Sequence, residues 1–188
     1  MKPQSSPRRA PTPLDEGRLQ ELALRYVGKY ATTRAKLRQY LMRKVRERGW
    51  SGNGEPDLDL LANRFAELGY VDDGAYAMAN SRALTARGYG KRRLSDQLRV
   101  AGVDPADSAA AAVHADEMAL DSALRLAERK RLGPFASATG DPAQRQKWIS
   151  ALVRAGHGFA LAEAIATLPP GADIDIDQLR ERFNVIGA

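Results

Sequence analysis

The sequence of 188 residues predicts an all-α protein made of three successive sets of three helices. Apolar residues recur at helical spacing along most of the chain, whereas strand patterns are almost absent. Three of the predicted helices end in a glycine eight residues after an apolar position, at Gly49, Gly102 and Gly156. These glycines are 53 and 54 residues apart, and a near-constant period is typical of a repeat array.

The charges of the chain alternate in sign along its length. Residues 25–50 hold nine basic residues and one acidic residue, whereas residues 51–81 hold six acidic residues and one basic residue. Residues 82–99 and 122–154 are again basic, and the segments that follow each of them are acidic. If the basic segments stack on one side, they form a positive stripe that suits an anionic partner. The alternative is that they are ordinary solvated helix faces.

The first repeat is expected in residues 18–70. Residues 1–17 are rich in proline, serine and charge, which predicts a disordered N-terminal arm. The three helices are predicted over residues 18–30, from Thr32 or Thr33 to Arg48, and from Asp57 to Leu68. Threonine and aspartate are favourable N-cap residues, and glycine favours a helix end.

The second repeat is expected in residues 71–115 and the third in residues 116–168. Helices are predicted over 72–87 and 90–101, and another begins at Asp104-Pro105 and breaks near Asp116. The third repeat then has helices that end at 133, cover 141–156 and cover 159–168. Residues 169–188 are expected to form an acidic tail with a short helix over 177–185.

Residues 71–103 hold the strongest candidate contact site. A turn, Gly88-Tyr89-Gly90, is surrounded by basic residues, and we expect its glycines to let the backbone approach a partner closely. The basic residues are Arg82, Arg87, Lys91, Arg92 and Arg93.

This stretch resembles the signature of the RecX family, which regulates the RecA recombinase of bacteria. The matching residues are Asp72, Asp73, Tyr76, Ala77, Arg82, the run from Gly88 to Leu94, Leu98 and Gly102. Residues 33–50 are similar to the family's first repeat. The resemblance implies an elongated, curved array of three three-helix repeats. It also implies that the array lies in the groove of the RecA nucleoprotein filament and inhibits ATP hydrolysis and strand exchange.

We therefore expect the basic residues of the second helices to bind the RecA filament or DNA. Arginine pairs with carboxylates and with phosphates, so a direct DNA-binding repeat protein is an alternative, and a helical adaptor for another acidic protein is a third. For Arg93, an ion pair with Asp72-Asp73 inside the chain is also open. The expected partner-binding residues are Arg34, Arg38, Arg43, Lys44, Arg46, Arg82, Arg87, Tyr89, Lys91, Arg92 and Arg93. The expected structural signature is Asp72, Asp73, Tyr76, Gly88, Gly90, Leu94, Leu98 and Gly102.

The composition leaves little catalytic material. The chain has no cysteine, and its only imidazoles are His114 and His157. We expect His157 to cap carbonyls at a helix end and His114 to lie on a helix surface. We assign no catalytic residue, metal or cofactor. No apolar run approaches the roughly 20 residues of a membrane span, so we expect the protein to stay in the cytoplasm. An elongated array needs no self-association, so we expect a monomer.

Overall fold

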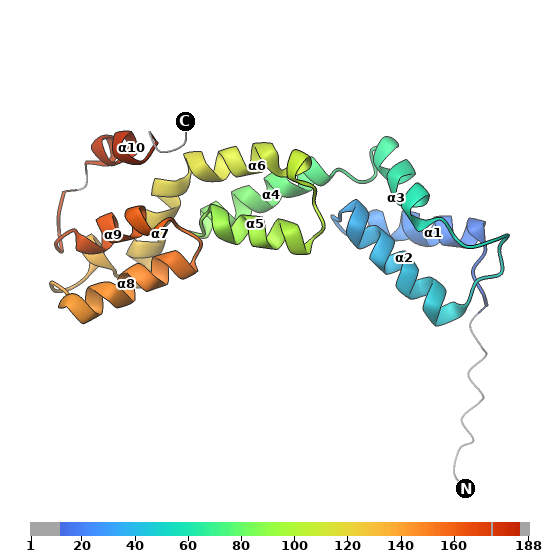
Figure 1. Ribbon diagram of the computed structural model, residues 1–188, viewed down its shortest axis with the longest axis horizontal. Coiled ribbons are helices and arrows are strands. Elements are labelled where there is room, and N and C mark those ends of the chain that lie inside the picture. The colour runs from blue at the N-terminus through green and yellow to red at the C-terminus, as the bar shows by residue number, and fades with distance from the viewer. Residues whose placement is uncertain (1–11, 174, 185–188) are drawn as a thin grey trace, which may run out of the picture. The chain divides into compact units, whose positions relative to one another are not determined.

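The computed structural model describes residues 12–173 and 175–184, and its described part is all-helical (Figure 1). Ten α-helices and one short 3-10 helix account for the regular structure of this part, which confirms the all-α prediction. The chain divides into two compact units, Met1–Asp72 and Asp73–Ala188. None of the described helices is long and apolar enough to cross a membrane.

The first unit is a set of three helices, α1 (Glu16–Val27), α2 (Arg34–Arg48) and α3 (Leu58–Glu67). Each helix begins at a side-chain cap: the oxygens of Asp15, Thr33 and Asp57 accept backbone N–H groups of the first turn at 2.9, 3.1 and 2.8 Å. The apolar faces meet in one core, formed by Leu14, Leu19, Ala23, Leu37, Leu41, Ala62, Phe65 and Val71.

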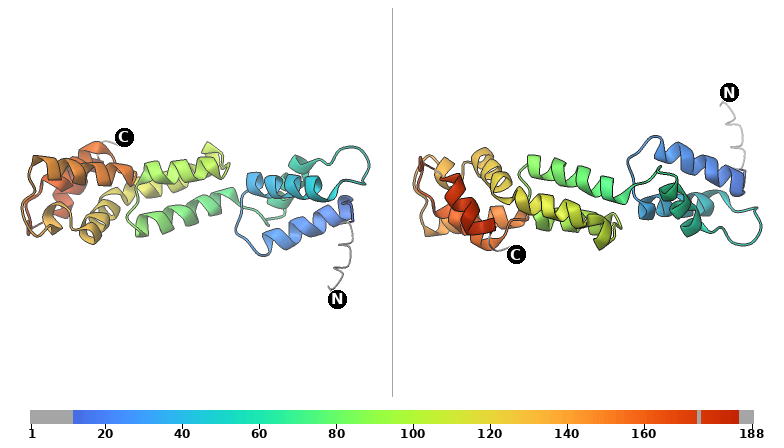
Figure 2. Two further views of the ribbon diagram at one scale, coloured as in Figure 1. Left: turned by 90° about the horizontal axis from the view of Figure 1, so that it is seen from below. Right: turned by 90° about the horizontal axis from the view of Figure 1, so that it is seen from above.

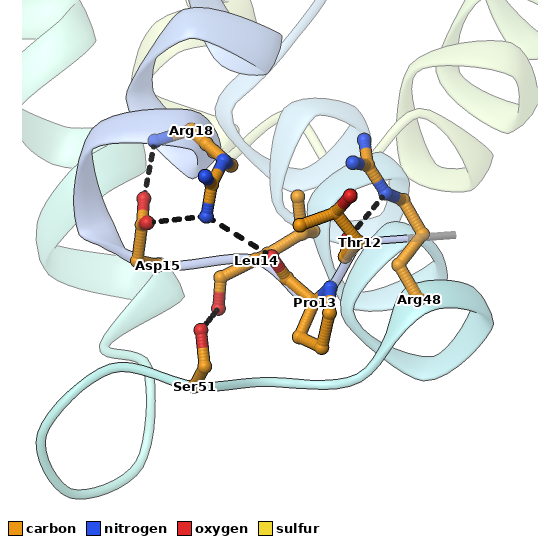
Figure 3. A network of polar contacts seen from close by, with 7 residues as sticks. All are labelled: Thr12, Pro13, Leu14, Asp15, Arg18, Arg48 and Ser51. Atoms are coloured by element: carbon orange, nitrogen blue, oxygen red, sulfur yellow. Dashed lines mark hydrogen bonds and ion pairs between the residues drawn. The ribbon is translucent and has the colours of Figure 1, made fainter. Parts of the chain in front are cut away.

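The segment before α1 corrects the prediction of a disordered arm through residue 17. Leu14 is fully buried, its N–H donates to the carbonyl of Gly49 at 2.9 Å, and its carbonyl accepts the N–H of Ser51 at 2.8 Å. The Arg48 side chain also donates to the Thr12 carbonyl at 3.1 Å (Figure 3). Residues 12–17 are therefore part of the fold, because one leucine enters a core formed largely by residues far along the chain. The rest of the expected arm, residues 1–11, lies outside the described residues.

The second unit holds two further sets of three helices. The first of these is α4 (Asp73–Ala86), α5 (Lys91–Val100) and α6 (Pro105–Glu117), and α4 lies beside α6 (Figure 2). The next is α7 (Ala119–Lys130), α8 (Pro142–Arg154) and α9 (Phe159–Thr167), with the 3-10 helix η1 (Gly133–Phe135) after α7. Each of these two sets has its own apolar core. The repeat relation between the sets and the elongated, curved outline stay predictions.

A glycine with a positive φ follows the middle helix of each set. Gly49, Gly102 and Gly156 follow α2, α5 and α8, and each has a positive φ, of 84°, 69° and 99°. A positive φ is accessible to glycine at little cost, and glycines of this kind are common just after helix ends. The apolar residues eight positions earlier are buried in all three cases.

The chain after α9 folds back onto the third set of helices. It forms α10 (Ile176–Asn184), close to the predicted short helix, and Leu179 packs against the core of α7–α9. Arg180 pairs with Asp121 of α7 at 3.1 Å, and the N–H of Gly171 donates to the carbonyl of Pro134 at 2.9 Å.

Candidate partner-binding surfaces

The turn between α4 and α5 is where the two helical sets of the second unit meet. A Cβ atom at Gly90 would lie 2.5 Å from the carbonyl oxygen of Gly156, and one at Gly88 would lie 3.1 Å from Cβ of Leu126. Both glycines therefore serve a close backbone approach inside this unit, and our interpretation that they free the backbone for an outside partner is wrong. Tyr89 between them is half-buried and packs against both cores.

Backbone hydrogen bonds fasten this joint, which we define as residues 88–93 with residues 155–157. The N–H of Gly90 donates to the Ala155 carbonyl at 3.0 Å, and the N–H of Arg92 donates to the Gly156 carbonyl at 3.2 Å. The buried ring of His157 donates from Nε2 to the Gly88 carbonyl at 3.1 Å. Burial lowers the pKa of His157, because desolvation disfavours the charged ring. His157 thus caps a carbonyl just beyond α4, not one of its own helix end as we expected.

Two arginines of α7 also bind the end of α4, and neither was predicted from the sequence. Arg129 donates to the Arg87 carbonyl at 2.7 Å, and Arg125 donates to the Thr85 carbonyl at 3.4 Å. Cations are favourable at a helix C-terminus, where carbonyl groups carry the negative end of the helix dipole. The only signal in the sequence was their spacing of four residues on a basic helix.

The cations around the joint differ in how they are used within the chain. Lys91 pairs with Asp116, and the guanidinium of Arg87 lies 5.4 Å from the centre of the Tyr89 ring. The side chains of Arg82, Arg92 and Arg93 are exposed and form no ion pair with any described residue. The alternative in which Arg93 pairs with Asp72-Asp73 is therefore not found in the structure.

Several expected contact residues of α2 are paired inside the first unit. Arg38 joins α2 to α3 through an ion pair with Asp59 at 2.6 Å. Lys44 and Arg43 both pair with Glu47, at 2.6 and 3.6 Å. Within the described part, Arg46 is exposed and has no ion pair, and Arg34 at the start of α2 is half-buried.

A tyrosine cluster lies beside these cations and was not predicted as a site. The rings of Tyr26 and Tyr40 are stacked with centroids 4.1 Å apart, and Tyr30 lies 5.3 Å from Tyr26. Lys29 lies 5.4 Å from the Tyr30 ring centre and Arg43 lies 5.7 Å from that of Tyr40. We predicted a helix through residue 30, but Tyr30 lies beyond the end of α1 and is exposed.

The expected structural signature occupies cores and turns. Leu94 and Leu98 are buried among α4–α6, Tyr76 packs against the same core, and Asp73 is buried at the first turn of α4. Asp72 is exposed, and Gly102 ends α5.

A serine and a histidine meet between α4 and α6 without forming a catalytic pair. Oγ of Ser81 lies 2.9 Å from Nδ1 of His114, but the same hydroxyl donates to the Ala111 carbonyl at 2.9 Å. Ser81 is fully buried, and its proton is used by that carbonyl, so the histidine does not act as its base. His114 is therefore half-buried and structural, not simply a surface residue. Among the described residues, no group of three or more His, Cys, Asp or Glu could hold a metal ion.

The fold and these surfaces define an all-helical chain built from short three-helix sets. Its described part gives no indication of a catalytic centre. Comparison with known proteins then assigns the family. No family model matches the chain. It is, however, 32% identical over 162 residues to "Regulatory protein RecX" of Myxococcus xanthus (strain DK1622), covering 81% of this chain and 86% of that protein.

Other proteins with the same description agree. The chain is 38% identical over 96 residues to "Regulatory protein RecX" of Mycobacterium sp. (strain JLS), covering half of each. The crystal structure of RecX from Lactobacillus salivarius matches the fold with a TM-score of 0.64 at 18% identity, over 79% of this chain and 92% of that one. A second RecX crystal structure matches with a TM-score of 0.55 at 21% identity, over 79% of this chain and 72% of that one. The chain belongs to the RecX family of regulatory proteins, which confirms the resemblance seen in residues 71–103.

Proposed function

We propose that this chain regulates homologous recombination and DNA repair by binding the RecA nucleoprotein filament and inhibiting its ATP hydrolysis and strand exchange. The observation that carries the proposal is the 32% identity to a regulatory protein RecX across 86% of that protein's length. The chain acts in this proposal as a cytoplasmic monomer.

The start of α5 is the contact site that the described residues favour most. Its first turn holds Lys91, Arg92 and Arg93 and no acidic residue. Three cations at the positive end of a helix dipole are unfavourable for the helix itself, so their presence there is better explained by an anionic partner. The joint holds the backbone of this turn in place, which reduces the ordering cost of binding.

The test is single-stranded-DNA-dependent ATP hydrolysis by the cognate RecA, with this protein titrated from substoichiometric to equimolar ratios. Inhibition is expected, and it should weaken in the Arg92→Ala/Arg93→Ala variant, which removes two cations that have no acidic partner in the described structure. The matched control is Arg25→Ala/Arg99→Ala, which removes two exposed cations that are paired with Glu21 and Asp96. No inhibition by the wild-type protein at an equimolar ratio would contradict the proposal.

Direct binding of single-stranded DNA is the second candidate function, and the tyrosine cluster favours it. Aromatic rings beside cations suit single-stranded nucleic acids, because bases stack on the rings while the cations meet the phosphates. This function predicts tight DNA binding without the recombinase, a steep loss of affinity with salt, and a weaker complex for Tyr30→Ala. Little DNA binding at the salt concentration of the ATPase assay would contradict this second function and leave regulation of the filament as the only proposal.

A further inference from the structure

The first unit has a groove between α1 and α3 that is lined by both apolar and charged side chains. One hollow of about 740 Å³ is lined by these helices and by residues 50–57. A second hollow of about 420 Å³ adjoins it and shares two lining residues with it, Gln20 and Leu68. We call these two hollows together the α1–α3 groove.

Large apolar side chains are unusually exposed in the α1–α3 groove. Leu60 of α3 is 66% exposed, and Leu68, the residue after α3, is 58% exposed. Tyr70 is 53% exposed and Leu24 of α1 is 49% exposed. Single exposed leucines are ordinary, but four large apolar side chains along one groove form a patch of the kind that marks an interaction site.

The rim of this groove is acidic, in contrast to the basic surfaces described above. Its larger hollow is lined by four carboxylates, of Glu16, Glu55, Asp57 and Glu67, and by one cation, Arg64. Phosphate groups would be repelled by this rim, whereas lysines and arginines would be attracted to it.

We infer that the α1–α3 groove binds a basic amphipathic helix of a partner protein. The apolar stripe of such a helix would cover the exposed leucines and Tyr70, and its flanking cations would lie against the carboxylates. This surface is separate from the cations of the joint and carries the opposite charge, so the inference does not depend on the proposed function.

The walls of the α1–α3 groove are already held in place. The indole of Trp50 donates to the Gly54 carbonyl at 2.8 Å, and the N–H of Asn53 donates to the Glu16 carboxylate at 3.0 Å. The Ser51 hydroxyl donates to the Leu14 carbonyl at 3.2 Å, which ties the same loop to the start of α1 (Figure 3). A groove that is formed before binding loses little conformational entropy when a helix enters.

The test is a titration of the full-length protein, without recombinase or DNA, into a fluorescently labelled synthetic helix. This probe carries leucines at i, i+3, i+4 and i+7 and lysines elsewhere, and a second probe carries glutamates in place of the lysines. We expect the lysine probe to bind and the glutamate probe to bind much more weakly. Affinity for the lysine probe should fall by about tenfold or more in Leu60→Ser/Leu68→Ser, because the apolar contact is lost while the charge of the groove stays unchanged.

The control is Val100→Ser/Val113→Ser, which makes the same kind of change at two exposed apolar residues of α5 and α6. It should leave the affinity for the lysine probe unchanged, and circular dichroism should show the same helix content for both variants. Failure of the lysine probe to bind would overturn the inference. Equal binding of both probes, or equal losses in the two variants, would overturn it as well, since either would show unspecific apolar or charge attraction.

Discussion

Gly90→Ala is the sharpest test of the joint between the two helical sets of the second unit. Gly90 has φ −94° and ψ 175°, which alanine adopts without strain, so the substitution acts through space alone. The added Cβ would lie 2.5 Å from the Gly156 carbonyl oxygen and 2.8 Å from the backbone nitrogen of His157. These are backbone atoms held by hydrogen bonds, so the two segments must separate.

The expected loss of stability follows from two costs and one gain. Overpacking costs about 1–3 kcal/mol and weakening of the hydrogen bond from Gly90 to Ala155 costs about 1 kcal/mol. Alanine stabilises by about 0.4–1 kcal/mol through the unfolded chain, so the net loss is about 1–4 kcal/mol.

Urea unfolding followed by circular dichroism measures this loss, and Gly158→Ala is a matched control. Gly158 is also a glycine N-cap in an extended conformation, but a Cβ there would meet nothing within 4 Å. The control should stay within about 0.5 kcal/mol of the wild type, as surface substitutions usually do. Equal stabilities of the two variants would refute the close approach at the joint.

Three further substitutions test the cores and the buried histidine. Leu94→Ala should lower the free energy of unfolding by about 2–5 kcal/mol, because Leu94 is buried among α4–α6, and a stable variant would place it on the surface. Leu14→Ala should cost a similar amount, about 2–5 kcal/mol, whereas Pro13→Ala beside it should not, because Pro13 is exposed. The pKa of His157 is lowered from 6.5, so the unfolded chain binds its proton first as the pH falls. The free energy of unfolding should therefore decrease as the pH drops below about 6.5. His157→Gln should reduce this dependence on pH, measured by urea titrations at each pH. An unchanged dependence would contradict the buried neutral ring.

The helices were predictable because their signals are local. Caps such as Thr33 and Asp57, the Asp-Pro starts of α6 and α8, and the glycines at helix ends all act within a few residues of the boundary that they determine. Leu14 shows where such reasoning fails. Its neighbours are prolines and charged residues, and its hydrogen-bond partners Gly49 and Ser51 are more than 30 positions away.

The candidate contact site was predicted less well than the helices. The cluster of cations at the start of α5 was predictable, because Lys91, Arg92 and Arg93 are consecutive in the sequence and therefore share one helix turn. The role of Gly88 and Gly90 could not be predicted, since it depends on Leu126 and Gly156, which are far along the chain. Glycine permits a close approach, but its sequence position does not tell which backbone approaches.

The position of the joint connects the stability of the second unit to its proposed contact residues. Arg92 donates its backbone N–H to Gly156, while its side chain extends into solvent, so the same residue fastens the helical sets and presents a cation. Loss of the side chain in Arg92→Ala leaves that backbone hydrogen bond intact, whereas Gly90→Ala disturbs it and keeps every cation. If partner binding falls in the first variant at unchanged stability, the charge itself makes the contact. If it falls only in the second, the relative placement of the two helical sets is what the partner recognises.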